Sequence, residues 1–177
     1  CGSVVGASHV ESQLTGLSAS PAQVPAHGAR TRFLCDAADF ARLLKILHDR
    51  GVVHLDIRAP NVMFTAEPKA RAVLVDFGAS RLVSDPPEMF LHGSIGTASK
   101  SVLEAAVSGE PLTVTPSDDV QSFIRCFYVE AFNATPPRKA HAAMEFWNEA
   151  ERNHPILIEL TAMCNENPIP YDAIRQR

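Results

Sequence analysis

The sequence predicts a mainly helical domain that carries one small β-hairpin. Apolar residues recur at helical spacing in several segments between residues 36 and 164, which is typical of helices with one face on a core. Only two short apolar runs, 62–64 and 73–75, read as strands of a hairpin, and a turn-rich spacer separates them. The chain has 177 residues, of which 46% are hydrophobic, so it is long enough for one domain with a substantial core.

The first predicted helix spans residues 36–50. Its apolar positions share one face, and they are Ala37, Phe40, Leu43, Leu44 and Leu47. Asp36 is a suitable N-cap, and Gly51 follows the helix where a left-handed glycine commonly ends one. His48, in the last turns, is expected to be a packing residue and not a ligand.

Three further helices are predicted, over residues 117–133, 140–153 and 155–164. Ser117 or Asp118 can cap the first of them, because acidic and hydroxyl side chains favour the positive end of a helix. Trp147 is expected to lie in the core. Residues 165–176 are expected to form a tail.

The ends and the charge of the chain limit its classes of function. Residues 1–31 are rich in Gly, Ser, Ala and Pro, which predicts a linker or a remnant of a preceding region, with the domain over residues 32–177. The chain starts with Cys1 and not with Met, and we expect it to be a fragment or the product of a truncated gene model. The net charge of -4 favours neither nucleic acid nor membrane binding. No apolar run approaches the roughly 18 residues of a membrane span.

The four cysteines are widely spaced and form no C-x-x-C pair. A metal centre or a disulfide framework is therefore not expected, and reduced thiols indicate an intracellular protein by default.

Chemistry-bearing residues gather on both sides of the predicted hairpin. His54 and Asp56 follow the apolar pair 52–53, and Asn61 comes after four intervening residues. The second apolar run ends at Asp76, Phe77 and Gly78. Each piece alone is common, since Asp-Phe-Gly is a usual turn after a buried strand. In this order and at these spacings, the pieces predict one functional site.

This combination resembles the catalytic loop and the Asp-Phe-Gly turn of protein kinases. The resemblance covers about residues 36–165, the large and mostly helical C-terminal lobe of an α+β family fold, with a casein-kinase-like or fungal kinase-like character. It implies transfer of a phosphoryl group from Mg²⁺-ATP to a Ser or Thr hydroxyl of a protein substrate. Neither a G-x-G-x-x-G loop nor a Val-Ala-Ile-Lys strand precedes the motif. The small lobe is thus expected to be missing, or to be encoded upstream or separately.

The resemblance assigns catalytic roles on the loop. Asp56 would be the base or orienting group for the attacking hydroxyl, and Arg58, where the family commonly has lysine, would screen the transferred phosphate. His54 would be a structural member of the loop. Leu55 departs from the family's usual Arg, which suggests that activation through a phosphate bound there is not used.

The same resemblance assigns the nucleotide and metal ligands. Asn61 and Asp76 would hold Mg²⁺, because amide and carboxylate oxygens are ligands that Mg²⁺ accepts while it keeps several waters. Phe77 and Gly78 would complete the nucleotide-binding turn, where Gly78 lets the backbone bend.

Later segments resemble the rest of such a lobe. Thr97, after Gly96, would brace Asp56 and Arg58, and Glu104 would close the substrate-docking segment. The second acid of the 117–133 helix, Asp119, would hold the catalytic-loop backbone from below. Asp118 is expected to be a solvated acid at the helix start.

Two alternatives to a protein kinase stay open. One is a non-catalytic, truncated kinase-like module that binds partners, because without a small lobe ATP would be held on one face only. The other is a small-molecule phosphotransferase of the aminoglycoside or choline type, which shares Asp-x4-Asn but usually carries His in place of Arg58. Arg58, Thr97 and Asp119 favour the protein-kinase side.

Overall fold

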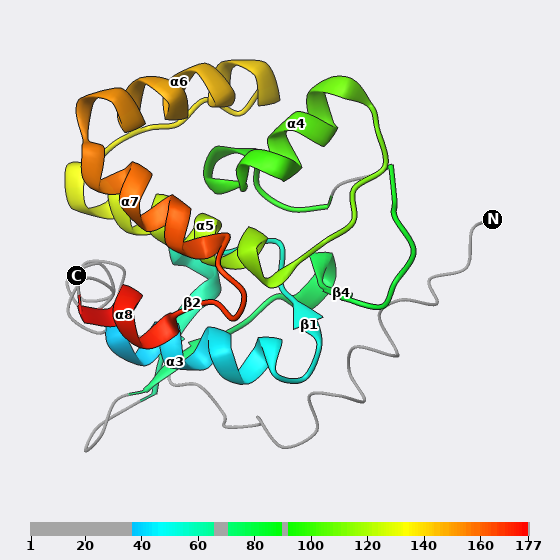
Figure 1. The fold of residues 1–177 in the computed structure, drawn as a ribbon, viewed down its shortest axis with the longest axis vertical. Coiled ribbons are helices and arrows are strands. Elements are labelled where there is room, and N and C mark those ends of the chain that lie inside the picture. The colour runs from blue at the N-terminus through cyan, green and yellow to red at the C-terminus, as the bar shows by residue number, and fades with distance from the viewer. Residues whose placement is uncertain (1–36, 66–70, 90–91, 177) are drawn as a thin grey trace.

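The computed structural model describes residues 37–65, 71–89 and 92–176. The predicted linker at 1–31 and the predicted cap Asp36 lie outside the described residues. The described part is mainly helical, which confirms the predicted fold class and matches a kinase-type large lobe (Figure 1). Its helices are α3 (Ala37–His48), α4 (Lys100–Ser108), α5 (Pro116–Phe132), α6 (Ala140–Asn153), α7 (Pro155–Cys164) and α8 (Tyr171–Gln176).

Four short strands form two antiparallel pairs. The hairpin joins β2 (Val62–Phe64) to β3 (Ala72–Leu74), with Met63 opposite Val73. Its second strand begins one residue earlier than predicted. The other pair was not predicted and joins β1 (Val52–Val53) to β4 (Arg81–Leu82). This second pair places the residues after β1 beside the residues before β4, so both halves of the predicted site lie next to each other.

Helix α5 is the centre of the packing. It contacts α3 on one side, α4 on another, and α7 along its length. Figure 1 shows α3 and α8 on one side of α5 and α4 and α6 on the other. The fully buried side chains of the core come from all these layers and include Phe40, Leu44, Leu47, Leu103, Val120 and Trp147. The ring of Phe40 stacks on that of Phe123 at 4.8 Å between centroids, which joins α3 to α5.

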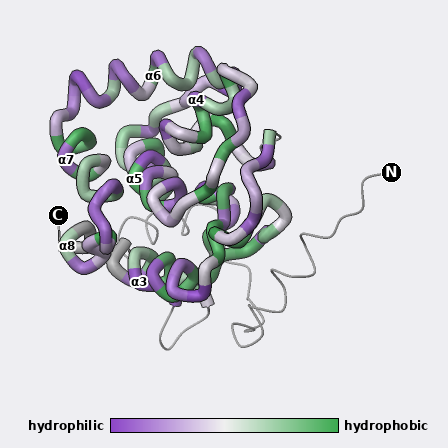
Figure 2. Tube along the Cα trace, turned by 45° about the vertical axis from the view of Figure 1, so that its right-hand side comes forward, coloured by the Kyte–Doolittle hydropathy of each residue, from purple (hydrophilic) through white to green (hydrophobic). Residues whose placement is uncertain are grey.

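Helix α6 lies at the edge of the molecule. Figure 2 shows that its trace is largely hydrophilic with some hydrophobic residues between, which is typical of a helix that is mostly exposed and buries one face. Ala143, Trp147 and Ala150 form the buried face. The core position of Trp147 was predicted, and the bounds of α6 and α7 agree with the prediction.

Two helices were missed by the sequence analysis. Helix α4 occupies residues that were interpreted only as the end of a docking segment, and α8 occupies the predicted tail. Helix α4 starts with Ser99, whose hydroxyl accepts from the N–H of Val102, and ends at Gly109 with a φ of 74°. Such caps define a helix of only nine residues, and its one-sided apolar pattern is too short to stand out.

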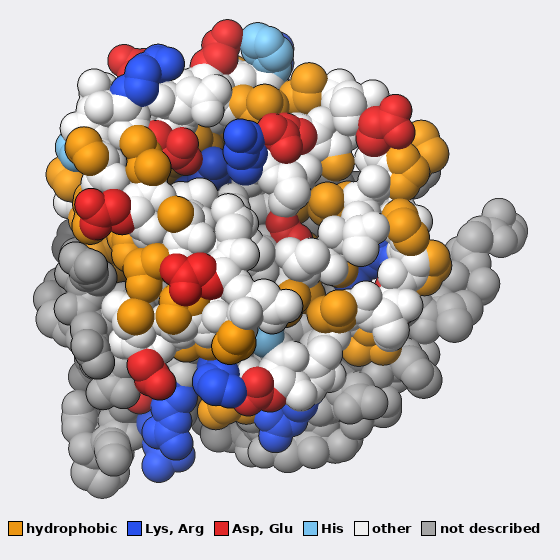
Figure 3. All heavy atoms as spheres, in the orientation of Figure 1, with side chains coloured by type: hydrophobic (Ala, Val, Ile, Leu, Met, Phe, Trp, Pro, Cys, Tyr) orange, Lys and Arg blue, Asp and Glu red, His pale blue; other side chains and the backbone are white. Residues whose placement is uncertain are grey.

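The surface carries both signs of charge. On the face shown in Figure 3, acidic and basic side chains are interspersed, and hydrophobic side chains lie over α7. Ile156 and Ile158 of α7 are 46% and 53% exposed. Within the described ranges, no helix combines the length and the apolar character that a membrane crossing requires.

Candidate active site

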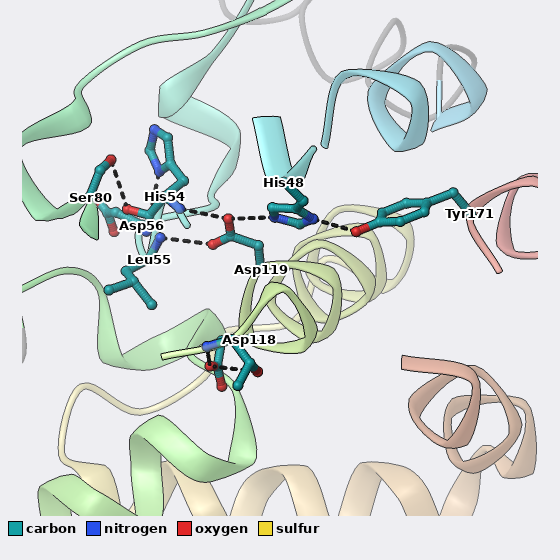
Figure 4. A network of polar contacts seen from close by, with 9 residues as sticks. His48, His54, Leu55, Asp56, Ser80, Asp118, Asp119 and Tyr171 are labelled. Carbon is teal, nitrogen blue, oxygen red and sulfur yellow. Dashed lines mark hydrogen bonds and ion pairs between the residues drawn. The ribbon is translucent and has the colours of Figure 1, made fainter. Parts of the chain in front are cut away.

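Asp119, in the first turn of α5, holds the backbone of the 54–56 loop. Its carboxylate is fully buried and accepts the N–H of His54 at 2.6 Å and the N–H of Leu55 at 2.8 Å (Figure 4). Leu55 has a φ of 64°, a left-handed conformation that costs energy for a residue other than glycine. The role predicted for Asp119, support of the loop from below, is confirmed by these bonds.

The burial of a charged carboxylate requires compensation. Asp119 receives a third hydrogen bond from the ring of His48, whose Nε2 lies 3.0 Å from Oδ2. Its position in the first turn of α5 adds the positive end of the helix dipole. The loop therefore rests on a carboxylate that three hydrogen bonds hold in place.

The prediction for Asp118 was wrong, because this side chain is buried and not solvated. Its Oδ1 accepts the hydroxyl of Ser99 at 2.7 Å and also that of Ser101, and its Oδ2 accepts the N–H of Thr115 at 2.8 Å. Asp118 thus caps α5 and ties the start of α4 to it. Both acids of the pair are structural anchors on opposite sides of the helix start.

His54 joins the two halves of the site. Its ring is fully buried, with Nε2 3.1 Å from the carbonyl of Val75 and Nδ1 3.3 Å from the N–H of Asp56. This pattern fits a neutral ring that donates from Nε2 and accepts at Nδ1. Phe77 packs edge-on against the ring at 4.7 Å between centroids. His54 therefore holds the loop and the Asp-Phe-Gly turn together.

Asp56 is engaged at both carboxylate oxygens. Oδ2 accepts from Nδ2 of Asn61 at 2.7 Å, and the same nitrogen also donates to the carbonyl of Asp56 at 2.9 Å. Oδ1 accepts the backbone N–H of Ser94 at 2.7 Å. Asp56 as a whole residue is only 8% exposed, and the segment around Ser94 covers its carboxylate. Sequence reasoning gave no signal for this contact, because it is made by a backbone group.

Arg58 lies beside this carboxylate with its side chain 41% exposed. Its Nε is 3.3 Å from Oδ2 of Asp56, close enough for an ion pair. The same nitrogen is buried and makes no hydrogen bond within the described part of the chain, since its N–H does not have hydrogen-bond geometry toward Asp56. A buried N–H without an acceptor is costly, so this group is available to an anionic ligand.

Asn61 and Asp76 are brought together by the hairpin. The carbonyl of Asn61 accepts the N–H of Val75 at 3.0 Å, which places Asp76 one residue beyond that bond. Among the described residues, Asn61 uses only its side-chain nitrogen and Asp76 is exposed, so an oxygen of each remains open to a ligand. An amide and a carboxylate oxygen fit a Mg²⁺ ion that keeps its waters. No group of three or more His, Cys, Asp or Glu side chains suited to a metal occurs among the described residues.

The Asp-Phe-Gly turn is tightly built. Asp76 has a φ of 62°, and the next three residues form a 3₁₀ helix, Phe77–Ala79. A Cβ on Gly78 would lie 3.3 Å from Oδ1 of Asp76, closer than most contacts of a real Cβ. Glycine at this position therefore leaves the Asp76 carboxylate room to move.

Thr97 lies under the loop but makes a different contact from the one predicted. Its hydroxyl donates to the carbonyl of Ile57 at 2.9 Å, the residue between Asp56 and Arg58. The expected brace on those two side chains is thus replaced by a brace on the backbone between them.

Two residues that sequence reasoning did not assign to the site anchor the segment of Thr97. Trp147 donates from Nε1 to the carbonyl of Gly96 at 2.9 Å, and Arg125 donates to the carbonyl of Ala98. Burial lowers the pKa of Arg125 to about 10, although the charge of Glu151 opposes that shift. The available signal was an arginine within the apolar run of α5, since a buried arginine needs partners.

Glu104 does not close the docking segment as predicted. It is exposed on α4, 3.8 Å from the amine of Lys100 one turn earlier. Arg125, the buried arginine of α5, forms its ion pair with Glu151 of α6, at 3.8 Å, and not with Glu104.

Comparison with known proteins gives several protein kinases. The chain is 30% identical to a calcium/calmodulin-dependent protein kinase of Emericella nidulans over 101 residues, 52% of this chain and 25% of that protein. It is 32% identical to a serine/threonine-protein kinase of Mycobacterium tuberculosis over 100 residues, 56% of this chain and 14% of that protein. It is 30% identical to a serine/threonine-protein kinase of Candida albicans over 108 residues, 55% of this chain and 10% of that protein. No family model matches.

The alignments thus cover about half of this chain and a quarter or less of these relatives. They support a protein-kinase-like chain.

Proposed function

We propose that this chain is the large lobe of a protein kinase that transfers the γ-phosphoryl group of ATP to a Ser or Thr hydroxyl of a protein. The observation that carries the proposal is the joining of Asp56, Asn61 and the Asp76 turn through hydrogen bonds of the loop and hairpin. Phosphoryl transfer asks a protein mainly to position groups and to offset charge. Asp56 offers a proton acceptor, and Asn61 and Asp76 offer metal ligands. Arg58 beside Asp56 adds a cation.

Each side chain has a distinct part in the proposal. Asp56 orients the substrate hydroxyl and accepts its proton. Arg58 offers the unused Nε–H to the transferred phosphate, which has the acceptor oxygens that this nitrogen lacks. Asn61 and Asp76 hold Mg²⁺. When bound, that ion neutralises charge on the phosphates.

The nucleotide would need a second surface. The present sequence contains neither a G-x-G-x-x-G loop nor a Val-Ala-Ile-Lys strand. An N-terminal lobe, upstream in the same protein or in a separate chain, would supply this glycine-rich loop and the strand lysine. We expect the complete protein to act in an intracellular, ATP-containing compartment.

A non-catalytic binding module is the second candidate, and one observation favours it. Both oxygens of Asp56 already accept a hydrogen bond, Oδ1 from Ser94 and Oδ2 from Asn61, so a substrate hydroxyl would meet a carboxylate that protein groups already hold. In this candidate the same lobe binds a protein partner and turns over no ATP.

The test is a calorimetric titration of the full chain with Mg²⁺-ATP, repeated on Asp76→Ala. Asp39→Ala is the matched control, because it removes an exposed acid from the first turn of α3 that is not among the proposed ligands. Binding by wild type and Asp39→Ala that is lost in Asp76→Ala supports the enzyme. Binding that survives in Asp76→Ala contradicts the metal role of that residue. No binding by any of the three favours the binding module.

A further inference from the structure

The C-terminal helix reaches the candidate catalytic loop through two side chains. The hydroxyl of Tyr171, the first residue of α8, lies 2.5 Å from Nδ1 of His48. The other ring nitrogen of His48 lies 3.0 Å from Oδ2 of Asp119. Asp119 in turn accepts the N–H groups of His54 and Leu55, so four links connect α8 to the loop (Figure 4).

The partners of His48 determine its protonation pattern. A carboxylate can only accept, so Nε2 of His48 carries the hydrogen that faces Asp119. In the neutral ring Nδ1 is then an acceptor, and the side chain is only 4% exposed, so water does not serve it. Tyr171 supplies the donor. Burial, and then the charges of Asp119 and Asp49, raise the pKa of the Tyr171 hydroxyl, which keeps its proton in place.

We propose that Tyr171 is a positioning residue for the 54–56 loop: its hydroxyl fixes the tautomer of His48, and His48 then fixes the Asp119 carboxylate that holds the loop backbone. The description of that loop as catalytic rests on the proposed function. The contacts from Tyr171 through His48 and Asp119 to the loop do not depend on that function.

The strained backbone of the loop explains why such support matters. Leu55 is held at a φ of 64° by its N–H bond to Asp119. A left-handed non-glycine residue persists only where its surroundings over-determine it. Loss of one link from the Tyr171 side lets the carboxylate rotate, and the N–H groups of His54 and Leu55 then open to solvent more often.

The experiment compares Tyr171→Phe with Tyr128→Phe. These are the two tyrosines of the chain, and both variants remove only a hydroxyl. Tyr128 packs its ring against Trp147 and His154, and its hydroxyl has no hydrogen-bond partner in the described part of the chain. Amide hydrogen exchange of the full 177-residue chain is measured by NMR. The ring ¹⁵N shifts of His48 are recorded as well, and the His48 signals are identified as those that are missing from the spectrum of His48→Gln.

In Tyr171→Phe, exchange at the His54 and Leu55 amides is expected to rise about tenfold, in line with the loss of one buried hydrogen bond, and the Nδ1 shift of His48 is expected to change. Tyr128→Phe is expected to change neither. Equal exchange in Tyr171→Phe and wild type overturns the proposal. A uniform rise over the amides of α5 and α7 also overturns it, because that pattern reports general loss of stability.

The wild-type spectrum is a second test that needs no variant. The proposal requires the neutral Nε2–H tautomer of His48 with an accepting Nδ1, and an Nδ1–H tautomer overturns it. If the complete kinase is active, Tyr171→Phe is also expected to lower kcat with the KM for ATP unchanged. Faster exchange at His54 and Leu55 in a protein without kinase activity supports the positioning role and contradicts the proposed function alone.

Discussion

The backbone N–H of Ser94 donates to Oδ1 of Asp56 at 2.7 Å, so the segment before the 95–97 turn covers the candidate base. Gly93 makes this approach possible. Its φ is 123°, and a Cβ there would lie 2.5 Å from the carbonyl oxygen of Leu55. The covering segment and the 54–56 loop are therefore in backbone contact.

Replacing Ser94 by proline tests whether this cover blocks the site. Proline removes the donated N–H, and the φ of -88° at this position is close to the range that proline adopts; Ser94→Ala retains the N–H and is the control. A hydrogen bond to a charged group contributes about 1.5–3 kcal/mol, so its loss shifts the population toward an uncovered Asp56 by about tenfold or more. In the complete kinase, with its N-terminal lobe, we expect a matching rise in phosphoryl transfer to a degenerate Ser/Thr peptide mixture. Transfer by Ser94→Pro at or below the rate of Ser94→Ala would contradict this.

Asp119→Asn is expected to be strongly destabilising. The amide replaces one acceptor oxygen by a donor, which must face a backbone N–H or His48 in a fully buried site. Breaking a buried charged network of this kind costs about 3–5 kcal/mol. The free energy of unfolding in urea, followed by circular dichroism, measures the loss. Asp39→Asn, at an exposed position of α3, is the control, and equal midpoints for the two variants would show that Asp119 does not support the fold.

The sequence was sufficient for the helical framework and for the main motif, because both depend on local spacing. The faces of α3, α5 and α6 follow from the 3.6-residue period, and the hairpin follows from two apolar runs around a turn. Asp119 could be predicted only through resemblance to known kinases.

The errors of prediction come from partners that are distant in the sequence. Asp118 is buried because Ser99 and Ser101 of another helix meet it, and nothing local to α5 indicates that contact. The cover over Asp56 is made by a main-chain N–H, which every residue except proline carries. Tyr171 was assigned to a tail because six residues of helix carry too little periodicity to be recognised.

Trp147→Phe tests the anchoring of the 95–98 segment. Phenylalanine keeps the aromatic packing but removes the N–H that donates to Gly96 at 2.9 Å. It also weakens the stacking of Arg125, whose guanidinium carbon lies 4.9 Å from the indole centre. The expected loss is about 1–3 kcal/mol of unfolding free energy, because the partly buried carbonyl of Gly96 is left without its donor.

Circular dichroism in urea measures this loss without the tryptophan signal. Tyr128→Phe removes a hydroxyl from a ring beside Trp147, and this hydroxyl makes no hydrogen bond within the described residues, so the variant is expected to change the midpoint little. A Trp147→Phe midpoint equal to that of Tyr128→Phe would contradict the anchoring role.

The buried thiols predict the chemical reactivity of the folded chain. Burial raises the pKa of Cys126 to about 12, with a further contribution from the charge of Glu130, and burial raises the pKa of Cys164 to about 12 as well. The thiolate is the reactive form, so both residues are expected to resist a disulfide reagent at pH 8 and to react in urea. A Cys1→Ser/Cys35→Ser variant isolates these two thiols. Rapid reaction of either one under native conditions would contradict their burial.

The same shifts predict a loss of stability in alkali. Below the ordinary thiol pKa of 9.0, Cys126 and Cys164 are protonated in both folded and unfolded chains, and the pH dependence from them is absent. Between pH 9 and about 12 only the unfolded chain releases these protons, so the free energy of unfolding falls by up to about 1.4 kcal/mol per pH unit for each thiol. Urea midpoints at pH 8, 9.5 and 10.5 measure the slope, where the pH values are chosen around that window. Cys126→Ala is expected to be less stable at pH 8 but to show a shallower fall, since one titrating group is gone. Equal slopes in the variant and its parent would contradict the raised pKa of Cys126.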